Sequence, residues 1–172
     1  MDAMSSPDPA SGLSHVRGEG SEAHAVMVDV SAKQPGRRVA VAGARVVFPG
    51  DLLERVLAGR GPKGPVLEVA RVAGIQGAKR TAELIPMCHP LGLDLVEIEF
   101  EVQGRGSLGI RCTAVTTART GVEMEALTGA SLAALTVYDM TKALEKGIRI
   151  EGLRLLEKSG GRSGHWTAPE PA

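Results

Sequence analysis

The chain has 172 residues, and its twenty basic and twenty acidic side chains give a formal net charge of zero. This balance argues against a nucleic-acid-binding protein, which needs a basic surface. Aromatic residues make up only 2 % of the chain, too few for the ring platforms on which single-strand binders stack bases. Hydrophobic residues reach 43 %, which excludes a fully disordered chain.

The cysteines and possible targeting segments give few further clues to the class of protein. Cys88 and Cys112 are too few for the disulfide framework of a small secreted domain. No stretch approaches the ~20 apolar residues of a membrane span, and the N-terminus lacks the apolar core of a signal peptide. We therefore expect a cytoplasmic protein with no membrane association. Because its core must be built from small aliphatic residues, we also expect it to bury surface against copies of itself.

The ends of the chain differ in composition from its middle. Residues 1–26 are rich in Ser, Gly, Pro and charge, with no apolar period, and are predicted to form a flexible arm. Residues 167–172 are predicted to form a flexible tail. The part between them, 27–166, is predicted to be a single folded domain.

The first half of the domain is predicted to hold one strand and two helices. A Val- and Ala-rich run predicts a strand over 37–48. Asp51 can cap a short helix over 52–59. A longer helix is predicted over 66–85, because Pro86 cannot continue it.

The second half is predicted to hold three strands and one long helix. Alternating apolar and acidic residues over 93–102 indicate a half-buried strand, joined by a hairpin to a strand over 108–117. A helix over 121–146 contains a long uncharged run, which indicates burial on most sides, and Gly147 can cap it. The last strand covers 148–156. This order predicts an α+β fold, a ferredoxin-like βαββαβ sandwich with an extra helix and an antiparallel sheet.

A carboxylate and an amine stand near the end of the long helix. Asp139 and Lys142 are three residues apart, so they share a helix face, which continues back through Leu135 and Thr128. A charged pair at the edge of a buried face perturbs the protonation of both groups, and lysine there can act as an acid or base. A structural ion pair is the alternative.

A proline-bounded loop places Cys88 beside His89. Loops of this kind often carry function. A zinc site and a thiolate nucleophile are both weakly indicated, because there is no second ligand pair and adjacent residues seldom orient one another. A solvated loop is the alternative.

Two glutamates flank the predicted start of the long helix. Glu123 can form a capping box with Thr120, and acidic residues are favoured there by the helix dipole. Glu125 is less well explained in this way, and a buried glutamate can accept hydrogen bonds from a purine-like edge.

Three basic residues lie in Gly-rich segments: Lys63, Lys158 and Arg162. Backbone amides and a lysine together can bind an anion. None of the segments matches the phosphate-loop pattern. Solvated loops are the alternative.

Four motifs in order and spacing carry a family resemblance. They are MVDVSAK (27–33), KGPVLEVARVAGIQGAKRTAELIPMCHPL (63–91), TGVEMEALTGASLAALTVYDMTKALEKG (120–147) and RLLEKSGGRSG (154–164). The chain closely resembles the molybdenum cofactor biosynthesis protein C family, the cyclic pyranopterin monophosphate synthases. Departures from the usual family pattern at Gly92 and Thr141 leave the charged pair intact.

The resemblance implies a catalytic domain with a ferredoxin-like fold and a definite reaction. It implies a lyase that converts (8S)-3′,8-cyclo-7,8-dihydroguanosine 5′-triphosphate to cyclic pyranopterin monophosphate and diphosphate in molybdenum cofactor (molybdopterin) biosynthesis. It further implies a hexamer, a trimer of dimers with active sites at subunit boundaries. No cofactor or catalytic metal is expected, although Mg²⁺ can accompany the triphosphate.

The resemblance also assigns site residues. It implies that Asp139 and Lys142 are the catalytic pair, for which we expect Lys142 to be the general acid/base. It implies substrate contacts from Met87, Cys88, His89, Glu123, Met124, Glu125, Lys63, Lys158 and Arg38, the last three serving the triphosphate.

Two other functions stay open. The first is a non-catalytic oligomeric relative that binds nucleotides or pterins. The second is a metal-dependent hydrolase that uses Cys88 and His89.

Overall fold

A five-stranded antiparallel sheet forms the base of the domain. The computed structural model describes residues 15–18, 20–59, 63–161 and 164–169. The strand order is β4 (Leu95–Val102), β5 (Ser107–Ala118), β3 (Gly36–Val47), β6 (Arg149–Ser159) and β7 (Trp166–Thr167). Every paired neighbour is antiparallel.

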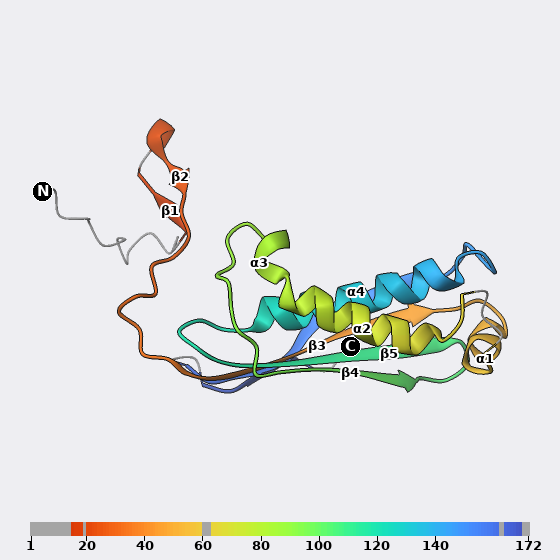
Figure 1. Cartoon of the computed structure of the whole chain (residues 1–172). Coiled ribbons are helices and arrows are strands. Elements are labelled where there is room, and N and C mark those ends of the chain that lie inside the picture. Colours follow the sequence, from red (N-terminus) through yellow and green to blue (C-terminus); the bar gives the residue numbers. More distant parts are fainter. Residues whose placement is uncertain (1–14, 19, 60–62, 162–163, 170–172) are drawn as a thin grey trace, which may run out of the picture.

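Two long helices cover one face of this sheet. Figure 1 shows α2 (Val66–Lys79) and α4 (Glu123–Thr141) side by side, with α1 (Leu52–Leu57) beyond one end of the sheet and α3 (Thr81–Leu84) following α2. Leaving aside α1, α3 and the short β7, the chain runs β3-α2-β4-β5-α4-β6. This order and the β4-β5-β3-β6 arrangement confirm the predicted ferredoxin-like α+β fold.

The core is made of small side chains, which bring the helices close to the sheet. Ala40 and Ala42 on β3 and Ala130 on α4 are fully buried and belong to the same core cluster. A Cβ added to Gly74 of α2 would lie 2.9 Å from the Gly129 carbonyl oxygen of α4. This close packing lays α4 along the sheet, so its two ends lie toward opposite ends of the domain.

Several predicted helix ends are wrong. The helix predicted over 66–85 divides at Arg80 into α2 and α3, and α4 ends at Thr141 rather than near residue 146. Lys142 directly follows α4 and occupies its C-terminal cap position, so Gly147 does not cap this helix.

The predicted side-chain caps also do not form. Asp51 precedes α1 without a side-chain capping bond. Thr120 donates its hydroxyl to the Gly121 carbonyl, and Val122 is the residue that precedes α4. The capping box therefore fails, because the helix begins at Glu123 itself.

The predicted N-terminal arm contains local structure. Residues 1–14 lie outside the described part of the chain, as does Arg162. Within the arm, β1 (Val16–Arg17) pairs with β2 (His24–Ala25) around the short helix η1 (Gly20–Glu22). Figure 1 shows this hairpin standing away from the sheet and helices, joined to β3 by residues 26–35. At the other end, β7 spans the predicted boundary between domain and tail.

No helix in the described ranges is long and apolar enough to span a membrane.

Candidate functional site

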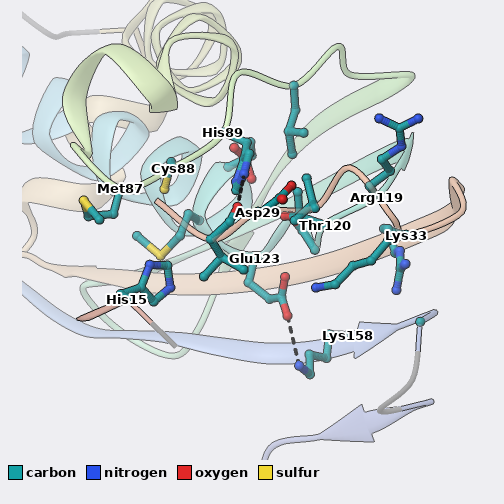
Figure 2. Close-up of a pocket in the computed structure, with 18 of the residues that line it drawn as sticks. His15, Asp29, Lys33, Met87, Cys88, His89, Arg119, Thr120, Glu123 and Lys158 are labelled. Carbon is teal, nitrogen blue, oxygen red and sulfur yellow. Dashed lines mark hydrogen bonds and ion pairs between the residues drawn. The ribbon is translucent and has the colours of Figure 1, made fainter. Parts of the chain in front are cut away.

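A cavity of about 1370 Å³ opens where four segments meet. They are the chain before β3, the loop after α3, the start of α4 and the end of β6 (Figure 2). The cavity is lined by most of the residues that the sequence predicted to contact substrate: Arg38, Met87, Cys88, His89, Glu123, Met124, Glu125 and Lys158. The fold thus gathers residues that are up to 120 positions apart in the sequence.

Two carboxylates occupy different depths of this cavity. Glu123 pairs with Lys158 (Oε1 to Nζ, 3.0 Å), and both side chains are about one-third exposed (Figure 2). Glu125 is only 4 % exposed. Burial, and secondarily the charge of Glu123, raises the pKa of Glu125. The cavity therefore offers a paired carboxylate near β6 and a buried carboxyl group whose pKa is raised.

The thiol and imidazole of the loop are not arranged as a catalytic dyad. Burial, followed by the charge of Glu125, raises the pKa of the Cys88 thiol, which disfavours a thiolate nucleophile. His89 directs Nε2 at the Val28 carbonyl oxygen, 2.8 Å away. Across the described ranges, no group of three His, Cys, Asp or Glu side chains is placed to hold a metal ion.

The remaining predicted residues form a separate lysine–aspartate cluster, made of Lys63, Asp139 and Lys142. Asp139 accepts a hydrogen bond from Lys63 (Nζ to Oδ2, 2.8 Å) and pairs with Lys142 (Nζ to Oδ1, 2.7 Å). Lys63 Nζ also donates to the Asp139 carbonyl oxygen at 3.1 Å. The three side chains are each about half exposed.

The lysine–aspartate cluster does not line the cavity of its own chain. Glu123 begins α4 and Asp139 lies near its end. Sixteen residues of helix, at about 1.5 Å per residue, separate them by roughly 24 Å. The sequence predicted that Lys63 and Lys158 lie together around the ligand. Within one chain, Lys63 instead pairs with Asp139 and Lys158 pairs with Glu123, in two separate places.

The hydrogen bonds within the lysine–aspartate cluster set its protonation. Bonds from Lys142 and then Lys63 lower the pKa of Asp139 to about 2. The bond to Asp139 raises the pKa of Lys142. Both groups are therefore charged near neutral pH. The helix face predicted to bury them is only partly buried, since Thr128 is buried but Leu135 is exposed.

Charged residues that the sequence patterns did not single out also line the cavity. Asp29, Lys33 and Arg119 do so, and His15 lies at its edge in the N-terminal hairpin. Asp29 and Lys33 belong to the MVDVSAK motif, whose charges were a usable signal. Arg119 directly follows β5, where cross-strand pairing brings the start of β3 alongside the end of β5. With Arg38 and Lys158, these residues give the cavity four Lys or Arg side chains.

The domain combines a ferredoxin-like fold with an open cavity lined by four Lys or Arg side chains and a buried carboxylate, a combination suited to a small anionic ligand. The family model described as "MoaC family" matches residues 27–161. The chain belongs to the MoaC family.

Three relatives share about half of their residues with this chain, and each is named cyclic pyranopterin monophosphate synthase. The protein of Novosphingobium aromaticivorans is 51 % identical over 160 residues, covering 92 % of this chain and 98 % of its own. Those of Pelobacter propionicus and Listeria monocytogenes are 53 % and 52 % identical, each match covering 86 % of this chain and 92 % of the relative.

Proposed function

We propose that this protein is a cyclic pyranopterin monophosphate synthase, a phosphorus–oxygen lyase of molybdenum cofactor biosynthesis. Its substrate would be (8S)-3′,8-cyclo-7,8-dihydroguanosine 5′-triphosphate, and its products cyclic pyranopterin monophosphate and diphosphate. The observation that carries the proposal is the cavity, which combines four cationic side chains with the buried Glu125. The names of the relatives support it.

The cavity has groups suited to both parts of such a substrate. Lys33, Arg38, Arg119 and Lys158 provide positive charge for the triphosphate. Glu125 provides a buried carboxyl for the polar edge of the guanine-derived ring. Met87 and Met124 add adaptable apolar surface in a cavity that has no aromatic side chain among its described lining residues.

The lysine–aspartate cluster would supply the proton transfers. Opening the purine ring and closing the pterin ring both require proton movement, for which Lys142 is the proposed acid/base and Asp139 its partner. In the last step a sugar hydroxyl attacks the α-phosphorus. A new phosphorus–oxygen bond forms, the bond to diphosphate breaks, and the hydroxyl proton passes to a base. This step depends on positioning and charge neutralisation.

A complete site would need two copies of the chain. The lysine–aspartate cluster lies about 24 Å from the start of α4 along the helix, on a surface that also exposes Leu135. We propose that the cluster of one subunit faces the cavity of another in a hexamer, a trimer of dimers. Burial at that boundary would also bring the pKa of Lys142 down toward a useful range.

The proposal includes no resident cofactor or metal. Mg²⁺ can accompany the triphosphate but no step requires it. The reaction would take place in the cytoplasm, with no nucleic-acid or membrane partner.

Turnover of the cyclised GTP intermediate tests this function. The purified protein should release pyranopterin and diphosphate in equal amounts. Asp139→Ala and Lys142→Ala should each lower turnover at least ~100-fold, as expected on losing general acid/base catalysis, while the oligomer stays intact by light scattering. Binding of the intermediate without product would favour the non-catalytic relative. Near-normal turnover by either variant would contradict the assigned pair.

A further inference from the structure

The chain before β3 forms one wall of the cavity without belonging to a helix or strand. Residues 26–35, which we call the strap, contribute Asp29 and Lys33 to the lining. The strap is stiffened by bonds within itself. Ser31 N–H donates to Asp29 Oδ1 at 2.8 Å, and Lys33 N–H donates to the Val30 carbonyl at 3.0 Å.

Among the described residues, one hydrogen bond ties the strap to the body of the domain. His89 Nε2 lies 2.8 Å from the Val28 carbonyl oxygen, in partly buried surroundings (Figure 2). The other strap bonds found in the described ranges stay within the strap or, at Val26, go back to His15 in the N-terminal hairpin. The position of this cavity wall therefore depends on His89 and on the connection to β3.

We infer that His89 is a positioning residue, which holds the strap against the cavity and thereby places Asp29 and Lys33 beside the ligand. Because a carbonyl oxygen can only accept, Nε2 carries the proton of this bond. The identity of the ligand rests on the proposed function, but the role of His89 in holding the strap does not.

A glutamine replacement separates this role from direct chemistry by the imidazole. In His89→Gln the side-chain amide can place an N–H near the position of Nε2, but it cannot carry a charge or act as an acid or base. His89→Leu removes the donor and keeps a side chain of moderate size. An imidazole acting on phosphate or in proton transfer would be lost equally in both variants.

Hydrogen exchange of the ligand-free oligomer is the first measurement. In His89→Leu, amides of the 26–35 segment should exchange about fivefold faster, because a net hydrogen bond contributes about 1 kcal/mol. His89→Gln should keep near wild-type protection. His24→Leu is the matched control, since the His24 side chain is exposed and, among the described residues, its ring bonds to the Glu22 carbonyl of its own hairpin.

Kinetics with the cyclised intermediate are the second measurement. His89→Leu should raise KM about fivefold or more with a smaller change in kcat, and His89→Gln should restore KM. Unchanged strap exchange in His89→Leu would overturn the inference even if the enzyme is active. A His89→Gln variant as impaired as His89→Leu, with its strap still protected, would instead assign the imidazole a direct chemical role and also overturn it.

Discussion

At the scale of single residues, Asp139 stays ionised because two lysines bond to its carboxylate. A carboxylate between two lysines has a lowered pKa, about 2 here, because both cations favour its ionised form. The favourable pairing is therefore fully present above the ordinary pKa of aspartate and is lost only as the pH falls toward 2. Over the working range of an enzyme, changes in activity with pH should come from other groups.

Lys142 illustrates the difference between a charged pair and a working base. In one chain the bond to Asp139 raises its pKa, which keeps the amine protonated. A raised pKa also makes the ammonium a weaker acid, so both donating and accepting a proton near neutral pH would require the pKa of Lys142 to fall. The sequence predicted mutual perturbation but not its direction, which depends on how exposed the side chains are.

Glu125 gives a pH-dependent prediction of stability. Burial raises its pKa. As the pH rises past the ordinary pKa of glutamate, this carboxyl therefore retains its proton to a greater extent in the folded protein than in the unfolded chain. Ionisation of the buried carboxyl then lowers the free energy of unfolding. Glu125→Gln should therefore unfold at higher denaturant than wild type at pH 8, and the difference should shrink near pH 4. A difference that grows toward pH 4 would contradict the assigned shift.

At the scale of elements, the strands and the long helices were predictable because their patterns are local. Alternation over the β4 region and the uncharged run in α4 were enough to predict both elements. The caps at Asp51 and Thr120 failed because a capping bond depends on backbone angles at one residue, which tertiary packing sets. The N-terminal hairpin was missed because its strands have two residues each, which is too short to show an apolar period.

The crossing of α2 and α4 gives a prediction about packing. A Cβ at position 74 would meet the Gly129 carbonyl and Ile98 Cδ1, both at 2.9 Å. Gly74→Ala should therefore lower the free energy of unfolding by about 1–3 kcal/mol, as overpacking does, despite the better helix propensity of alanine. Gly36→Ala is the control, because nothing lies within 4 Å of a Cβ there. Equal stability of the two variants, measured in denaturant, would contradict this close packing.

At the scale of the whole molecule, zero net charge conceals a strongly uneven distribution. The cavity gathers four cationic side chains, while Glu97, Glu99 and Glu101 lie exposed along β4. Composition excluded a broad basic surface but could not locate a small one. The positions of Lys33 and Arg119 required the fold, since the strap and the end of β5 are distant in sequence.

The division of the site into a cavity and a lysine–aspartate cluster could not be predicted from the sequence. Motif matching places all the residues in one set, but α4 holds Glu123 and Asp139 roughly 24 Å apart. A complete site would therefore depend on assembly. Each subunit would complete the site of a neighbour, and the predicted self-association would be required for activity.

Subunit mixing tests whether each site is shared between two subunits. Lys142→Ala disables the lysine–aspartate cluster, and Glu125→Ala disables the cavity, so each variant alone should be nearly inactive toward the cyclised intermediate. When the two are unfolded and reassembled together in equal amounts, sites shared between subunits should regain about a quarter of wild-type turnover, since half of the cavities and half of the clusters are intact. Reassembled mixed oligomers with no more activity than the separate variants would contradict the account.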